Sequence, residues 1–120
     1  RGAAFGDYDA DGRVDLVVSQ NGAETKLYHN ERATPGLRVR LQGPPGNPRG
    51  FGAVLRLEYG TRTGPAREVH GGSGYWSLDG AVQVLGMDGV ATAIAVQWPG
   101  GKTTETPVPQ GAREVKVAAP

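Results

Sequence analysis

Short runs of alternating apolar and polar residues are the feature that most constrains this chain. In residues 37–42 (LRVRLQ) and 92–98 (TAIAVQW) every second side chain is a large apolar one, and the alternation recurs in 53–59 and 113–117. Such a period places the apolar side chains on one face of an extended strand. The 20 glycines and nine prolines lie largely between these runs, as expected for turns, and no window has the apolar spacing and caps of a helix. The pattern predicts an all-β fold, an antiparallel β-sandwich or barrel-like domain.

Weaker strand signals and one interruption predict how the chain is divided. Further strands are expected at 14–19, 24–29, 66–70 and 81–85. Residues 30–36 (NERATPG) are polar and break the alternation. We therefore expect a small unit in residues 1–36 and a larger β domain in residues 37–120.

Composition excludes several classes of partner. The formal net charge is +1, which gives no electrostatic case for binding nucleic acid. No apolar run approaches the roughly 20 residues of a membrane-spanning helix, so membrane insertion is not expected. The chain has no cysteine and only two histidines, His29 and His70, so we expect no thiolate or transition-metal site. Its arginines, Arg38 and Arg40 among them, are expected on solvated strand faces, with polyanion binding as the alternative.

An acidic loop near the N-terminus predicts a metal ion. The stretch DYDADGRVD puts four aspartates into nine positions, where they repel one another unless a cation lies among them. Alternate side chains converge as the backbone curls, and Gly12 permits the sharp turn. Ligands that are all oxygen, with several carboxylates, favour calcium over magnesium. The predicted metal ligands are Asp7, Asp9, Asp11, Asp15 and the carbonyl of Arg13.

The loop has two alternative interpretations, an EF-hand and a turn without an ion. An EF-hand requires a bidentate Glu at loop position twelve, where this chain has Val18, and it requires flanking helices. Here the loop leads into a predicted strand, so it is a calcium loop in a β setting. The alternative is an Asp- and Gly-rich hairpin turn that holds no ion.

The first 30 residues resemble a known repeat. AFGDYDADGRVDLVV followed by NGAETKLYHN is similar to an FG-GAP (integrin-α type) β-propeller repeat. The resemblance implies that the Asp loop binds calcium through the ligands named above and that the flanking strands form part of a propeller blade. A partial blade leaves an apolar patch and an open strand edge, so we expect it to pack back onto the second domain or to self-associate.

The remainder resembles the ASPIC/UnbV domain, which follows FG-GAP repeats in secreted proteins of the cartilage acidic protein type. The matching stretches are NPRGFGAVLRL, REVHGGSGYWS, LGMDG and VQWPGGK. Where the family has an aromatic residue this chain has Gln83, and it lacks the acidic pair that follows the Gly-Tyr-x-Ser stretch. The resemblance implies a β domain in an extracellular, periplasmic or cell-surface protein whose signal segment lies outside this chain.

Two further clusters of residues bear on function. The aromatic residues Tyr75, Trp76 and Trp98 either pack in the core or form a platform for a glycan or peptide. Ser73 lies in Gly71-Gly72-Ser73-Gly74-Tyr75, which departs from the nucleophile-elbow pattern, so His70 and Asp79 are not expected to complete a hydrolase site. We expect a non-enzymatic calcium-binding module that contacts an extracellular protein or glycan, with a glycan-binding module as the alternative.

Overall fold

The computed structural model describes residues 2–71 and 80–120, and all regular elements in these ranges are strands. The N-terminal strands are β1 (Gly2–Gly6), β2 (Asp15–Gln20) and β3 (Ala23–Tyr28). They are followed by β4 (Leu37–Gln42), β5 (Val54–Tyr59), β6 (Arg62–Thr63), β7 (Arg67–Glu68), β8 (Val82–Leu85), β9 (Ala93–Gln97), β10 (Thr103–Pro107) and β11 (Glu114–Ala118). The predicted all-β class is confirmed. Over these ranges no helix has the length and apolar character needed to cross a membrane.

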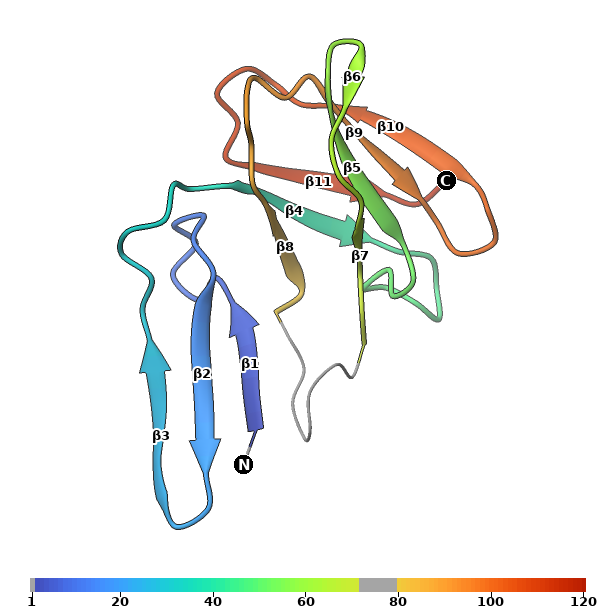
Figure 1. Cartoon of the computed structure of the whole chain (residues 1–120). Coiled ribbons are helices and arrows are strands. Elements are labelled where there is room, and N and C mark those ends of the chain that lie inside the picture. Colours follow the sequence, from blue (N-terminus) through green and yellow to red (C-terminus); the bar gives the residue numbers. More distant parts are fainter. Residues whose placement is uncertain (1, 72–79) are drawn as a thin grey trace.

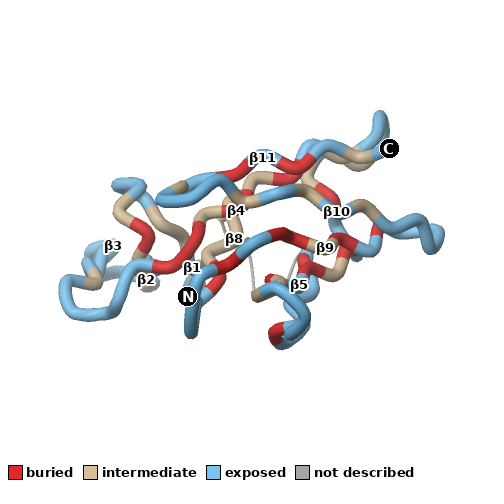
Figure 2. The backbone as a smooth tube through the Cα atoms, turned by 90° about the horizontal axis from the view of Figure 1, so that it is seen from above, coloured by how far each residue is buried: buried red, intermediate tan, exposed pale blue. Residues whose placement is uncertain are grey.

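Residues from β4 onward form two facing sheets (Figure 1). One sheet has the order β10-β9-β5-β6, with β7 also paired to β5, and the other has the order β11-β4-β8. Their inward side chains make one core, and the buried segments gather on strands of both sheets (Figure 2). The largest fully buried side chains are Leu37, Val39, Leu55, Ile94, Val96 and Val117. The arrangement is that of a β-sandwich, with no closed barrel among the described strands.

One strand pairing differs from the predicted antiparallel arrangement. β11 runs parallel to β4, with Val115 opposite Val39 and Val117 opposite Leu41. Alternation predicts which face of a strand is buried, but it does not predict the direction of the neighbouring strand. A parallel pair needs a long crossover, and here the chain passes through the opposite sheet between the two strands.

The first three strands form a separate antiparallel sheet with the order β1-β2-β3, which lies beside β8 and β4 (Figure 1). Among the described residues, backbone hydrogen bonds connect β1 and the loop that follows it to later parts of the chain. The Gly80 amide donates to the Phe5 carbonyl at 2.6 Å, and the Gly36 amide donates to the Gly12 carbonyl at 2.8 Å. The N-terminal strands therefore pack back against the second part of the chain.

Candidate metal centre

The Asp loop, residues 7–15, begins directly after β1 and reaches into β2. The loop turns tightly at Ala10 and Gly12, whose φ angles are 60° and 81°. Glycine adopts this left-handed region at the lowest cost. A Cβ atom at position 12 would also lie 3.0 Å from the Gly36 carbonyl oxygen. Both the backbone conformation and the close approach of the linker therefore favour glycine at this position.

The four predicted carboxylates converge in the loop. They belong to Asp7, Asp9, Asp11 and Asp15. One oxygen from each lies within 4.8 Å of the corresponding oxygens of the other three. Calcium ligands lie about 2.3–2.6 Å from the ion, so ligands on opposite sides of it are about 5 Å apart. The four oxygens can therefore surround one ion of this size. Oxygen-only donors of this kind suit the predicted calcium.

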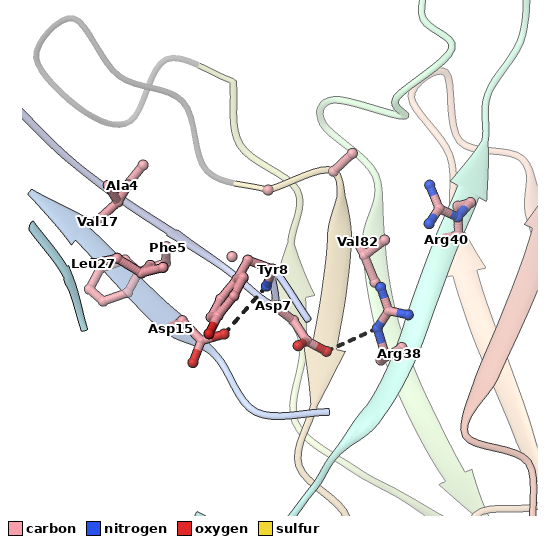
Figure 3. A pocket seen from close by; sticks show the side chains of 13 residues that line it. Ala4, Phe5, Asp7, Tyr8, Asp15, Val17, Leu27, Arg38, Arg40 and Val82 are labelled. Atoms are coloured by element: carbon pink, nitrogen blue, oxygen red, sulfur yellow. Dashed lines mark hydrogen bonds and ion pairs between the residues drawn. The ribbon is translucent and has the colours of Figure 1, made fainter. Parts of the chain in front are cut away.

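Asp7 is the most buried of these carboxylates, with a side chain that is 0% exposed. Its Oδ1 accepts the amide of Asp11 at 3.0 Å, and its Oδ2 accepts the amide of Gly12 at 2.8 Å. The Nε of Arg38, on β4, lies 3.0 Å from the same Oδ2 as an ion pair (Figure 3). The loop's own backbone therefore orients Asp7, and a cation from the sandwich balances its charge.

The position of Arg38 corrects the prediction of a solvated strand face. The side chain does point away from the core, as alternation requires, but it is only 13% exposed. The Asp loop covers it, and its Nη1 also contacts Glu114 Oε1 at 2.6 Å. The outward face of β4 is not solvated at Arg38, because the N-terminal segment packs on it.

Asp15 lies at the start of β2, and its side chain is 1% exposed. Its Oδ1 accepts the Asn30 amide at 2.7 Å, and its Oδ2 accepts the Tyr8 amide at 3.3 Å. His29 was not predicted to take part, yet its Nδ1 lies 3.1 Å from Asp15 Oδ1 and 3.6 Å from Asp9 Oδ2. The His29 ring also packs edge-on against Tyr8, with the ring centroids 5.6 Å apart.

His29 brings a nitrogen donor to the edge of the carboxylate group. One ring nitrogen of His29 and one oxygen each from Asp9 and Asp11 lie within 4.8 Å of one another. The pairing register explains this position. Leu16 on β2 is opposite Tyr28 on β3, so the residues next to them, Asp15 and His29, also come together. The sequence alone does not predict this contact, because it depends on the register between β2 and β3.

Two arginines offset part of the negative charge of the loop. The guanidinium group of Arg38 pairs with Asp7 and also with Glu114, and that of Arg13 pairs with Asp11. The Nη1 of Arg13 lies 3.1 Å from Asp11 Oδ2, and its Nε donates to the Ala33 carbonyl at 2.6 Å. Arg13 therefore acts in this structure through its side chain and its amide, which donates to Asp11 Oδ1 at 2.8 Å. Coordination by its carbonyl stays a prediction.

The pKa values of Asp9 and Asp11 are shifted in opposite directions. Partial desolvation, followed by the charge of Asp11, raises the pKa of Asp9 above its ordinary value. At Asp11 desolvation acts in the same upward direction, but hydrogen bonds from the Arg13 amide and guanidinium outweigh it and lower the pKa. The ionised form of Asp9 is thus less compensated by the protein than that of Asp11.

The predicted aromatic platform is only partly within the described residues. Tyr75 and Trp76 lie outside them. Trp98 is 4% exposed and belongs to the core, and its Nε1 donates to Thr104 Oγ1 at 2.9 Å. Its ring therefore presents no open face to a ligand, in line with the core alternative.

Of Ser73, His70 and Asp79, the structure describes His70 alone. Ser73 and Asp79 lie outside the described residues. His70 is exposed, and its Nδ1 lies 3.8 Å from Glu68 Oε1. This is a surface contact of the kind that contributes little.

A hollow with a volume of about 460 Å³ lies between the N-terminal sheet and the sandwich, beside the Asp loop (Figure 3). Apolar side chains of β1, β2 and β3 line one wall, and Arg38, Arg40 and Val82 line the other. Asp7, Tyr8 and Asp15 lie at the end nearest the metal centre. Packing between the two parts is therefore closest at the Asp loop and looser along the strands.

Comparison with known proteins identifies the family to which the larger part of the chain is similar. No curated protein matches it significantly. A family model described as "ASPIC and UnbV" matches residues 43–120, which begin one residue after β4 ends. The match covers β5 to β11 and most of the sandwich core, while β4 and the Asp loop precede it. On this match the chain belongs to the ASPIC and UnbV family.

Proposed function

We propose that this chain is a non-enzymatic, calcium-binding interaction module that works outside the cytoplasm. The observation that carries the proposal is the convergence of four aspartate oxygens within 4.8 Å of one another. Two of these carboxylates, on Asp7 and Asp15, have side chains that are 0% and 1% exposed. Burying this much negative charge is costly unless it is balanced, and a bound cation supplies part of that balance.

Calcium in this proposal has a structural role. The ion would hold the loop in one conformation by bridging Asp7 and Asp15, which belong to the two ends of the loop, through Asp9 and Asp11 between them. Extracellular modules with such ligands bind calcium with dissociation constants of about 10⁻⁴ to 10⁻³ M, which suits the calcium concentration outside cells. A site of this affinity would be empty at cytosolic calcium levels.

Residues 1–36 are proposed to be a partial FG-GAP-type repeat. Three antiparallel strands in the order β1-β2-β3, with the Asp loop between the first two, support this proposal. Both faces of the sheet carry exposed apolar side chains: Val17 and Leu27 on one face, and Phe5 and Tyr28 on the other. A sheet of this kind is suited to contact with neighbouring elements on both sides.

Isothermal titration calorimetry with calcium tests the metal proposal. The chain should bind one ion, and Asp9→Asn should weaken binding by about tenfold or more because it removes one carboxylate charge. Asp9 is the best position for this change because its side chain is 33% exposed and accepts none of the loop's backbone hydrogen bonds described above. Asp88→Asn, which removes an exposed carboxylate on the sandwich, is the matched control and should bind as the unaltered chain does. Absence of binding at millimolar calcium would refute the proposal.

The glycan-binding alternative now depends on Tyr75 and Trp76, since Trp98 is a core residue. A glycan array run with the unaltered chain and with Trp76→Ala separates the two functions. Glycan binding that is lost in Trp76→Ala and unaffected by a chelator would favour the alternative over the calcium-dependent module.

A further inference from the structure

The hollow beside the Asp loop has an aliphatic row along one wall (Figure 3). Ala4 of β1, Val17 of β2 and Leu27 of β3 follow one another across the N-terminal sheet. Val17 and Leu27 are 37% and 53% exposed, so their methyl groups are open to a molecule that enters the hollow. The volume of about 460 Å³ lies within the range of small-molecule sites, about 300–1,000 Å³.

Arg40 lies on the opposite wall without an ionic partner. It belongs to the outward face of β4 and is half-buried. Its neighbour Arg38 is already paired with Asp7 and Glu114. In contrast, no described residue forms an ion pair with the Arg40 guanidinium or accepts a hydrogen bond from it. A charged group that is partly withdrawn from water without a counter-ion is unfavourable, so Arg40 can gain from a bound anion.

A second cation adjoins Arg40. In the parallel pairing of β11 with β4, Lys116 is opposite Arg40, and the two side chains share the outward face. Like charges directly opposite each other destabilise a sheet. Glu114 balances Arg38 in the preceding row, but no described carboxylate does so for Arg40 and Lys116. Two such cations beside an aliphatic row suit a ligand with a carboxylate head and an apolar body.

The Asp loop restricts the orientation of such a ligand. Asp7 and Asp15 lie at the end of the hollow nearest the loop, where their charge repels another carboxylate. Arg38, which pairs with Asp7, marks this end on β4. Arg40 lies two residues further along the strand, a distance of about 6.6 Å. The head of the ligand therefore belongs beside Arg40, away from the loop.

We propose that this hollow binds a small straight-chain carboxylate. Its head lies between Arg40 and Lys116, where the Arg40 guanidinium donates two parallel hydrogen bonds to the two carboxylate oxygens. Its aliphatic chain lies along Val17 and Leu27 and removes their methyl groups from water. None of the proposed calcium ligands binds the head, so this binding does not require calcium.

Titration of the full chain with sodium octanoate, followed by the amide shifts in nuclear magnetic resonance, tests the site. One molecule should bind, while 1-octanol and acetate should bind at least tenfold more weakly, because each lacks one of the two recognised groups. Arg40→Met should weaken octanoate binding by about tenfold or more, since charge-assisted hydrogen bonds are lost. Lys116→Met, at an exposed position of β11, should weaken it by about threefold. Arg56→Met, at an exposed outward position of the other sheet, is the matched control and should bind as the unaltered chain does.

Absence of octanoate binding, or equal affinities of Arg40→Met and the unaltered chain, overturns the proposal. Equally tight binding of 1-octanol also overturns it, because that result describes adsorption to an apolar surface. Intermolecular nuclear Overhauser effects give a second test, and they should connect the octanoate chain to the methyl groups of Val17 and Leu27. Val90, which is 77% exposed and lies outside the hollow, is the control and should show none. Contacts confined to Val90 or to other methyl groups outside the hollow contradict the proposed site.

Discussion

Arg38 Nε lies 3.0 Å from Asp7 Oδ2, and this ion pair connects the Asp loop to a central strand of the sandwich. Arg38 belongs to β4, whose opposite face supplies Leu37 and Val39 to the core. The contact is largely withdrawn from water, with side chains 13% and 0% exposed. The Asp loop and the sandwich are therefore coupled through this ion pair.

The first prediction concerns this coupling. Arg38→Met should lower the free energy of unfolding by about 3 kcal/mol in the presence of chelator, because it leaves the buried Asp7 carboxylate without its cation. In millimolar calcium the loss should be smaller, since the metal supplies a second positive charge. Chemical denaturation followed by tryptophan fluorescence measures both values.

Arg40→Met is the matched control for this prediction. Arg40 lies on the same face of β4, two residues further along, and no described carboxylate forms an ion pair with it. The control should change stability much less than Arg38→Met does. Equal losses in the two variants, or a loss in Arg38→Met that calcium does not reduce, would contradict the coupling.

Alternation predicted the core of the sandwich because it reports directly which face of a strand is buried. Leu37, Val39, Ile94 and Val96 are all 0% exposed, and each was placed on an inward face from the sequence. β10 was missed for the same reason, since TTETP contains no apolar alternation. Its strand character comes from pairing along β9, with Thr104 opposite Val96, which is a tertiary contact.

The candidate metal site could be predicted only as far as its local sequence reaches. The four aspartates are close in sequence, and their convergence follows from the curl of one loop. His29 and Arg38 reach the same place from β3's end and from β4, through strand pairing and through the docking of one sheet on another. Spacing within a loop holds no information about such contacts.

The second prediction concerns Gly36. This residue directly precedes β4, and its amide donates to the Gly12 carbonyl of the Asp loop. A Cβ atom there would lie 2.6 Å from the Leu85 carbonyl oxygen and 2.9 Å from Val84 Cγ1. Gly36→Ala should therefore destabilise the chain by about 1–3 kcal/mol, as overpacking does. Gly86→Ala is the control, because a Cβ atom at that position meets no atom within 4 Å. Thermal unfolding of both variants is the measurement, and equal melting temperatures would show that the junction adapts freely.

The third prediction concerns the ion pair between Arg62 and Asp88 on the surface of the sandwich. The hydrogen bond from Arg62, at 2.9 Å, is the main cause that lowers the pKa of the Asp88 carboxyl. The Arg62 guanidinium also stacks on the Tyr59 ring, 4.2 Å from its centroid. A carboxyl titration by nuclear magnetic resonance should show a pKa for Asp88 below that of an unfolded aspartate, and Arg62→Gln should return it toward the ordinary value.

The sign of the resulting pH effect follows from this shift. Because the folded state binds the Asp88 proton less tightly than the unfolded state, the pair stabilises the fold above the unfolded pKa. That contribution is lost as the pH falls through the folded pKa. Since the side chains are 53% and 72% exposed, the effect should be small and should diminish in high salt. A pKa for Asp88 that is insensitive to Arg62→Gln would contradict this account.

The last prediction concerns the buried indole of Trp98. Its Nε1 donates to Thr104 Oγ1 at 2.9 Å, and the ring is 4% exposed. Thr104→Val keeps the shape of the side chain but removes the acceptor, so the buried N–H group loses its partner at a cost of about 1–3 kcal/mol. Thr106→Val is the control, because Thr106 lies two residues along the same strand and its hydroxyl has no hydrogen bond to the described residues. Combining Thr104→Val with Trp98→Phe removes donor and acceptor together, so the double variant should be less destabilised than the sum of the two single variants. Urea denaturation of the four variants measures this coupling, and strictly additive losses would show that the hydrogen bond contributes nothing to the stability of the sandwich.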